Sequence, residues 1–352
     1  MIHGEHSLSL LVLLAGLLLV ASLLVRAGLR RLQVPGLVGF LALGFLLRLA
    51  DGWWPVLSGE ATAVFDFLAK IGVVVLLFRI GLESNLRGLA RQLPRAGPIW
   101  AGNVLLSGVA GYATAHWLLG FERIPSLFAA VAFTATSVGV SMALWRRKDA
   151  LDSPSGELLV DVAELDDLSG VGLMAVLFAL VPMLRDPGAS ATTLIIAAIA
   201  GWLGFSLAIG ALFAGLLFSR DPDAIKFDAS FESIYELFMP FFFIGIGLGM
   251  APASLPRGLG LGAVLLAAAA AAKLAGAGAP ALLSTGRRGA LLIGLSMIPR
   301  AEITMIIMQR GRQLGDWAVP PRLYSGMVVV CAATCVVIPL LLDQLLDRRQ
   351  QD

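Results

Sequence analysis

Charged residues are scarce in this 352-residue chain. Only 14% of its residues are Asp, Glu, Lys or Arg, whereas a soluble protein of this size carries about 25%. The hydrophobic share is 58%, and the mean hydropathy is +0.86. These values exclude a soluble globular protein and predict an all-α polytopic membrane protein in a lipid bilayer. The net charge of +2 is small and the basic residues are spread through short loops, so no nucleic-acid partner is indicated.

Cysteine and histidine are also scarce. The two cysteines, Cys331 and Cys335, stand four residues apart in one apolar segment, and we interpret them as packing residues rather than a disulfide or a metal pair. Two of the three histidines lie at the extreme N-terminus, which excludes a histidine-rich metal centre, and we expect no resident cofactor. No Lys or Arg precedes the first apolar segment, as a signal peptide would require, so we expect that segment to remain as a membrane span.

Long apolar runs fill most of the chain. A span needs about 20 apolar residues to cross the hydrocarbon core, and eleven runs meet this requirement. Segment 192–218 would be about 40 Å long as one helix and is alternatively two short spans broken near Gly204, so counts of 12–13 are the alternatives. The eleven predicted spans are 8–25, 34–50, 61–82, 98–119, 126–145, 157–182, 192–218, 234–252, 258–283, 289–308 and 322–343.

Lys and Arg collect in alternate loops between these spans. With the N-terminus outside, fifteen basic residues fall in cytoplasmic loops and six in outer loops. Since cytoplasmic loops carry the excess of Lys and Arg, we expect the N-terminus outside and the C-terminus in the cytoplasm. Two crossings within 192–218 would reduce the contrast to thirteen against eight.

Two short stretches recur later in the chain. Pro35–Gly44 resembles Gly204–Gly215, and Leu76–Glu83 resembles Phe242–Gly249, at offsets of about 165–171 residues. With eleven spans, the two copies of each stretch cross the membrane in opposite directions, as in the inverted repeats of secondary transporters. We therefore expect a single transporter unit, 1–352, with five-helix repeats at 34–182 and 192–343. Chance similarity between Gly- and Leu-rich spans is the alternative.

Four acidic residues crowd into the seven-residue stretch that begins at Asp161. A charged side chain at the bilayer centre costs about 2.5–3.5 kcal/mol, so these acids must face protein, water or a counter-charge. At 100° per residue, Asp161, Glu164 and Asp167 form one stripe, whereas Asp166 faces about 100° away from Asp167. We expect Asp167 to line a polar path and Asp166 to turn towards Lys273, which lies in an Ala-rich span. Asp161 and Glu164 form either a cytoplasmic funnel for cations or simply a solvated helix start.

Two spans carry signs of interruption. Pro299 removes a backbone hydrogen bond within Ile298–Glu302. The matching helix of the first repeat contains the hydroxyl-rich stretch Phe133–Ser141. Unwound backbone at membrane depth occurs where it lines a cavity, and its carbonyls can coordinate a cation. The sequence thus predicts two interrupted helices at equivalent repeat positions.

Together these motifs resemble the monovalent cation/proton antiporter family, in the branch of bacterial Na+/H+ antiporters and Kef-type potassium efflux systems. The paired aspartates with Ile-Pro-Arg-x-Glu downstream are the more specific part, and the glycine-rich spans are less so. The stretches that carry the resemblance are Pro35–Gly44, Leu76–Glu83, Thr134–Ser137, Ala163–Gly170, Gly204–Gly215 and Gly294–Glu302.

The resemblance implies a core domain with two crossing unwound helices and a separate helical domain that forms a homodimer. It implies that Asp167 binds a monovalent cation or a proton in turn, and that Asp166 forms a salt bridge with Lys273. A double-aspartate pair of this kind goes with electrogenic exchange.

The resemblance also assigns the remaining polar residues of the two interruptions. Thr136 and Ser137 would lie beside the ion at the unwound crossing. Arg300 and Glu302 would be charged residues that stabilise the core.

Three departures from the family pattern stand out. Members of the family usually have about thirteen spans, and here a linker helix and the first helix of the second repeat are missing between Val181 and Gly204. No nucleotide-binding regulatory domain follows Gln351, which argues against a complete Kef-type system. Arg79 interrupts an apolar motif, and we expect it to pair with a nearby acid such as Glu83.

These observations predict a secondary antiporter in the cell (inner) membrane, and not an enzyme. It would exchange Na+, with K+ and Li+ as alternatives, for protons by alternating access. The enzyme alternative is an intramembrane Mg-dependent prenyltransferase, because the acids from Asp161 to Asp167 superficially fit diphosphate–Mg2+ chemistry, although no other span has an acid cluster. A cation channel with uncoupled flux is the third possibility.

Overall fold

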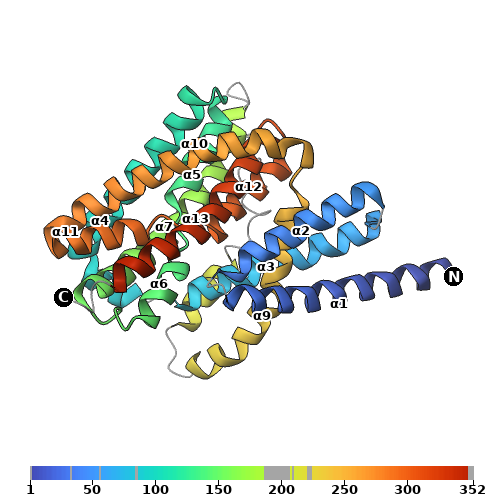
Figure 1. Cartoon of the computed structure of the whole chain (residues 1–352), viewed down its shortest axis with the longest axis horizontal. Coiled ribbons are helices and arrows are strands. Elements are labelled where there is room, and N and C mark those ends of the chain that lie inside the picture. The colour runs from blue at the N-terminus through green and yellow to red at the C-terminus, as the bar shows by residue number, and fades with distance from the viewer. Residues whose placement is uncertain are drawn as a thin grey trace. The chain divides into compact units, whose positions relative to one another are not determined.

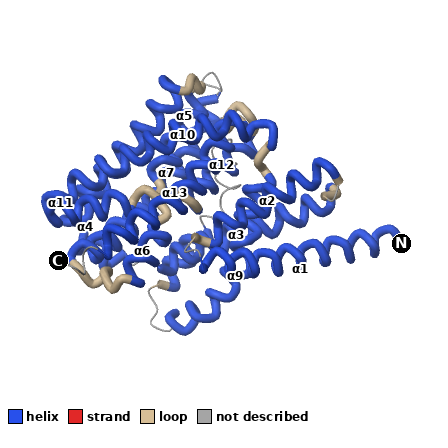
Figure 2. Tube along the Cα trace, viewed as in Figure 1, coloured by secondary structure: helices blue, strands red, loops and turns tan. Residues whose placement is uncertain are grey.

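A computed structural model of the chain shows helices joined by loops in the residues it describes, which are 2–31, 34–54, 57–83, 86–185, 207, 210–219 and 224–347 (Figures 1 and 2). No strand occurs within these ranges. The predicted class, an all-α membrane protein, is therefore confirmed. The described chain divides into two compact units, each built from two separate parts of the sequence.

The first unit comprises Met1–Glu83 and Ala211–Pro252. Its helices, blue and yellow in Figure 1, are α1 (Ile2–Arg31), α2 (Gly36–Trp53), α3 (Gly59–Glu83), the helical segment 210–218 and α9 (Ala224–Leu248).

The second unit comprises Ser84–Gly210 and Ala253–Asp352. It contains eight α-helices within its described part, and α4 and α10 each run directly into a five-residue π-helix, Thr114–Leu118 and Leu274–Gly278. The helices are α4 (Leu86–Ala113), α5 (Arg123–Thr134), α6 (Val138–Arg147), α7 (Pro154–Arg185), α10 (Leu255–Lys273), α11 (Ala279–Ser296), α12 (Glu302–Leu314) and α13 (Pro321–Asp347).

Eight helical stretches within the described residues are long and apolar enough to cross a membrane. One of them, Pro256–Ser296, contains a bend at Gly286, where φ is +69°. This backbone conformation favours glycine, and the bend falls between the predicted spans 258–283 and 289–308. Most of the predicted span 192–218, including the motif that starts at Gly204, lies outside the described residues, as do most residues between Val181 and Gly204. The total of eleven spans therefore stays a prediction.

Close glycine contacts hold the first unit together, and their pattern is reciprocal. A Cβ atom at Gly44 of α2 would lie 2.0 Å from the carbonyl oxygen of Ile244 in α9, and one at Gly247 would lie 2.2 Å from that of Leu41. A Cβ at Gly81 or Gly215 would likewise lie 2.1 Å from backbone oxygen of the facing helix. The stretch Pro35–Gly44 thus packs against Phe242–Gly249 through Gly44 and Gly247. The stretch Leu76–Glu83 contacts the end of Gly204–Gly215 through Gly81 and Gly215.

Arg79 contacts the side chains of three polar residues within the first unit. Its Nε donates to Glu83 Oε1 at 2.7 Å, its Nη1 lies 3.1 Å from Glu232 Oε2, and its guanidinium stacks 4.2 Å above the ring of Tyr235. The predicted pairing of Arg79 with Glu83 is confirmed. The charge of the arginine is therefore compensated within the motif that it interrupts.

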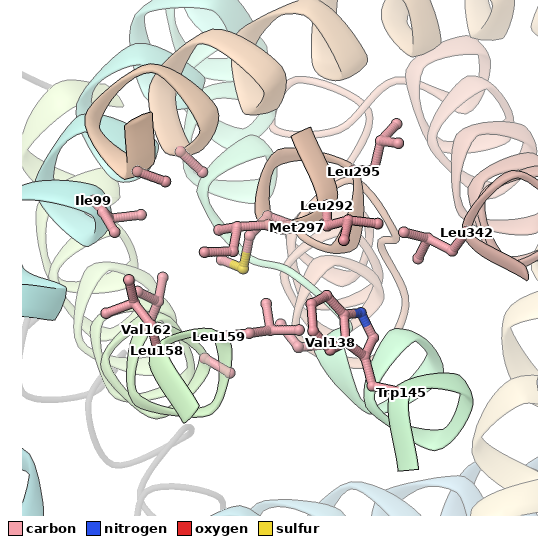
Figure 3. Packing of buried hydrophobic residues seen from close by; sticks show 14 of the residues in the cluster. Ile99, Val138, Trp145, Leu158, Leu159, Val162, Leu292, Leu295, Met297 and Leu342 are labelled. Atoms are coloured by element: carbon pink, nitrogen blue, oxygen red, sulfur yellow. The ribbon is translucent and has the colours of Figure 1, made fainter. Parts of the chain in front are cut away.

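An apolar cluster packs around the inner helices of the second unit (Figure 3). Trp145 of α6 is fully buried in it, and its indole N–H donates to the Ser296 hydroxyl at 2.9 Å. Cys331 and Cys335 of α13 are free thiols and are buried as well, as packing residues should be. The labelled side chains come from α4, α6, α7, α11 and α13 and from the segment after α11: Ile99, Val138, Trp145, Leu158, Leu159, Val162, Leu292, Leu295, Met297 and Leu342.

Candidate ion-binding site

Two interrupted helices meet in the second unit. Residues 135–137 separate α5 from α6, and residues 297–301 separate α11 from α12. The two interruptions touch, because the backbone N–H of Ser137 donates to the carbonyl of Pro299 at 2.7 Å. One turn further on, the Ser141 hydroxyl donates to the Ser296 carbonyl at 2.9 Å. The breaks lie where the proline and the hydroxyl-rich stretch of the sequence predict them.

Arg300 binds the C-terminal end of α5. It is fully buried, and its Nη1 donates to the carbonyls of Ala132 and Ala135, each at 3.1 Å, and also to that of Phe133. The last carbonyls of a helix have no partner within the helix and carry partial negative charge. The guanidinium therefore compensates these carbonyls and is compensated by them.

Glu302 lies at the N-terminal end of α12, on the other side of the crossing. It stands in the first turn of α12 and accepts a hydrogen bond from the Ser137 hydroxyl at 2.7 Å. An acidic side chain is favourable at a helix N-terminus because the N–H groups there carry partial positive charge. Arg300 thus places a positive charge at the partly negative C-terminal end of α5, and Glu302 places a negative charge at the partly positive N-terminal end of α12.

Lys273 is a second buried cation at the same end of α5. Its ammonium group, which is fully buried, donates to the Thr134 carbonyl at 2.7 Å and to the Thr136 hydroxyl at 2.6 Å. It also lies 3.9 Å from Asp166 Oδ1, close enough for attraction but too far for a hydrogen bond. Lys273 immediately precedes the π-helix Leu274–Gly278, and such segments are frequent at functional sites.

Asp166 is buried and receives its direct hydrogen bond from α4. The Asn103 amide Nδ2 donates to Asp166 Oδ1 at 2.6 Å, and both side chains are at most 1% exposed. The π-helix that follows α10 approaches α4 closely here, since a Cβ on Gly102 would lie 2.5 Å from the carbonyl oxygen of Gly276. The acid is therefore held between an amide and an ammonium group.

The other acids of α7 are more exposed than Asp166. Asp167 is half-buried and interacts electrostatically with Lys273. Asp161 and Glu164 are half-buried as well, and Asp161 interacts electrostatically with Glu157. Within the described ranges, His, Cys, Asp and Glu side chains form no cluster of three or more suited to a metal ion.

Six of the nine predicted site residues fall into two groups, and Asp167, Asp161 and Glu164 lie on α7 outside both. Asp166, Lys273 and Thr136 form one network, and Ser137, Glu302 and Arg300 meet at the crossing. Three carbonyls of the hydroxyl-rich stretch Phe133–Ser141, which was expected to offer carbonyls to a cation, already accept hydrogen bonds: those of Phe133 and Ala135 from Arg300, and that of Thr134 from Lys273.

Asn103 is the residue that the sequence reasoning missed. It is the one amide side chain in the predicted span 98–119. A hydrogen-bonding side chain in an apolar span usually bonds to a neighbouring helix, and this signal was available in the sequence.

Comparison with known proteins finds sodium/hydrogen exchangers and antiporters similar to most of this chain. The family model described as sodium/hydrogen exchanger, transmembrane, matches residues 16–200 and 187–348. The Na(+)/H(+) antiporter of Enterococcus hirae is 26% identical over 89% of this chain and 92% of its own length. The high-affinity Na(+)/H(+) antiporter NhaS3 of Synechocystis is 36% identical, but the match covers 34% of this chain and only 26% of that protein.

The fold is also shared with a solved structure. The sodium proton antiporter MjNhaP1 from Methanocaldococcus jannaschii superimposes with a TM-score of 0.66 at 14% identity, over 97% of this chain and 99% of that one. The relatives are transporters, which removes the support for a prenyltransferase. The resemblance seen in the motifs is confirmed: this chain is a multi-pass membrane protein that belongs to the sodium/hydrogen exchanger family of cation/proton antiporters.

Proposed function

We propose that this protein exchanges a monovalent cation, Na+ most readily, for protons by alternating access, with Asp167 as the carrier carboxylate. The observation that carries the proposal is the pair of aspartates on α7 beside a buried, charge-compensated crossing of two broken helices. Asp166 is buried and held, whereas its neighbour Asp167 is half-buried. A cation from the aqueous phase would reach Asp167 more readily than Asp166. The names of the relatives support Na+ as substrate, with K+ and Li+ as alternatives.

Coupling in this proposal comes from competition. A proton and a cation cannot both neutralise the Asp167 carboxylate, and a ligand shifts a conformational equilibrium only through different affinity for the two states. A cation that used the Thr136 hydroxyl would displace the Lys273 ammonium, which could then move towards Asp166, 3.9 Å away. Asp161 and Glu164 would attract cations on the cytoplasmic approach.

The architecture that we propose around this site is an inverted repeat, 34–182 and 192–343, within one transporter unit. The reciprocal glycine contacts of the first unit support it. A pseudo-two-fold axis would relate the contact between Gly44 and α9 to the contact between Gly215 and α3, because it exchanges the two repeats. We further propose that the first unit mediates a homodimer in the cell membrane, with the N-terminus outside and the C-terminus in the cytoplasm.

Everted membrane vesicles test the proposal. Vesicles with Asp167→Asn should lose Na+-driven proton movement, because an amide cannot alternate between a proton and a cation. Asp149→Asn is the matched control, since Asp149 is an exposed acid in the loop after α6, and it should exchange at the wild-type rate. Full exchange by Asp167→Asn would overturn the carrier assignment, and Na+ flux without proton movement in the wild type would favour a channel.

A further inference from the structure

We infer that Thr334 of α13 is a positioning residue of the proposed ion site, because it holds the broken backbone at Arg300. The inference rests on the proposed function, since the affinity for a cation affects transport only if the protein is a cation carrier. Thr334 lies outside the two broken helices and the acidic helix α7. It is fully buried, and its hydroxyl accepts a hydrogen bond from the Arg300 backbone N–H at 3.1 Å.

Unwound backbone at membrane depth needs partners within the protein, because the hydrocarbon offers its polar groups no water. Pro299 has no N–H, and its carbonyl accepts a hydrogen bond from the Ser137 backbone at 2.7 Å. The Arg300 N–H binds Thr334, and the Arg300 carbonyl accepts a hydrogen bond from the thiol of Cys335, a weak donor, at 3.4 Å. Two of these three backbone groups are therefore bound by adjacent side chains of α13.

The Thr334 hydroxyl is oriented by its own helix. A hydroxyl group has one proton to donate and two lone pairs that accept. Its proton goes to the Val330 carbonyl at 2.8 Å, the bond to the preceding turn that threonine often makes within a helix. The lone pairs are then available to the Arg300 N–H. Valine has nearly the same shape, so packing alone does not require the hydroxyl, whereas the backbone donor at the helix break does.

The position of Arg300 in turn affects two proposed ion-site residues. Its guanidinium binds the carbonyl of Ala135 at 3.1 Å, directly before Thr136. The preceding carbonyl, that of Pro299, binds the backbone N–H of Ser137. A displaced Arg300 backbone would therefore move both Thr136 and Ser137. Groups that bind a ligand must be held within about 0.5 Å of their productive geometry, so the hydrogen bond from Arg300 to Thr334 should affect cation affinity.

The test compares variants of the full-length protein. Thr334→Val keeps the shape of the side chain and removes the hydroxyl, and Thr334→Ser keeps the hydroxyl and removes the methyl group. Ser325→Ala is the matched control, because it removes another buried hydroxyl of α13, which pairs with the Ser254 hydroxyl at 2.8 Å and not with a helix break. If Thr334→Val does not fold, Thr334→Ala removes the same hydroxyl and takes its place.

The first measurement is the Na+ dependence of Na+/H+ exchange in proteoliposomes at constant pH. A buried donor left without its acceptor changes an equilibrium constant by about tenfold, so Thr334→Val should raise the KM for Na+ by about tenfold. The rate at saturating Na+ should fall less, because bound Na+ favours the ordered site. Thr334→Ser should restore the wild-type KM, and Ser325→Ala should keep it. A wild-type KM in Thr334→Val, or an equal rise in Ser325→Ala, would overturn the inference.

The second measurement is amide hydrogen–deuterium exchange of the purified protein, read by mass spectrometry, and it needs no transport. Without the Thr334 hydroxyl, the peptide that contains residues 297–301 should take up deuterium faster. The same peptide should keep the wild-type rate in Thr334→Ser and Ser325→Ala. An unchanged rate in Thr334→Val would contradict the inference. Full Na+/H+ exchange by Asp167→Asn would overturn the proposed carrier alone, because deuterium uptake would still decide whether Thr334 holds the break.

Discussion

At the scale of single residues, the crossing depends on two buried cations that share one helix end. Arg300 binds the carbonyls of Ala132, Phe133 and Ala135, and Lys273 binds that of Thr134. Burying a charge is costly unless it is paired and hydrogen-bonded. Here the partial negative charge of the α5 C-terminus is part of that pairing. The two cations differ in their hydrogen-bond partners. One partner of Lys273 is a side-chain hydroxyl, that of Thr136, whereas the Arg300 side chain binds backbone carbonyls.

We predict that Arg300→Leu destabilises the protein by about 3 kcal/mol or more, because each buried carbonyl left without a donor costs about 1–3 kcal/mol. Arg300→Lys should recover only part of this loss, since one ammonium group lacks the planar fork of the guanidinium. Thermal unfolding of the purified variants measures both effects. Arg48→Gln is the control, because the Arg48 side chain is 50% exposed and its removal should change little. Wild-type stability in Arg300→Leu would contradict a structural role for the guanidinium.

At the scale of helices, glycine at the contacts decides how close the backbones come. Gly44 and Gly247 join α2 to α9, and Gly81 and Gly215 join α3 to the segment 210–218. Association of helices in lipid lacks a hydrophobic driving force, so close packing of small residues contributes much of the stability. The glycine-rich motifs of the sequence are therefore contact surfaces of the first unit.

A methyl group at such a contact should be enough to disturb it. Gly247→Ala places a Cβ 2.2 Å from the Leu41 carbonyl oxygen, and overpacking of this kind costs about 1–3 kcal/mol. The midpoint of thermal unfolding should fall accordingly. In Gly16→Ala the new Cβ meets nothing within 4 Å, so this control should be neutral or slightly stabilising. Equal stability of the two variants would show that the α2–α9 contact tolerates separation.

At the scale of the whole molecule, both compact units draw on both halves of the chain. The first unit takes residues before Glu83 and from Ala211 to Pro252, and the second takes the remainder. The proposed ion site lies entirely in the second unit, with residues from α7 and α10 and from the two interruptions. The orientation of this assembly in the membrane is proposed from the distribution of Lys and Arg alone.

Cysteine labelling tests that orientation. Glu122 and Asp149 are exposed residues in the loops before α5 and after α6. Under the proposed topology, a membrane-impermeant maleimide should label Glu122→Cys in intact cells and Asp149→Cys in everted vesicles. The native Cys331 and Cys335 are buried, so the unmodified protein serves as the background control. The reverse labelling pattern would place the N-terminus in the cytoplasm.

The sequence by itself determined the membrane class, the two helix breaks and the direction of Asp166. Apolar content and run length depend only on composition, Pro299 removes a backbone donor wherever it stands, and the 100° step of a helix separates Asp166 from Asp167. These are local properties of the chain. They can be inferred from the sequence without knowing which residues lie close together in space.

Only the tertiary structure decided which groups meet at the crossing. Ser137 and Glu302 lie 165 residues apart, and Asn103 and Asp166 lie 63 apart, so no local rule could pair them. Asn103 has no periodicity or charge that pairs it with Asp166 in particular, and its hydrogen bond to that residue follows from the approach of α4 to α7. The bonds of Arg300 and Lys273 to the end of α5 follow for the same reason, because a carbonyl at a helix break accepts whichever donor the packing of the helices brings to it.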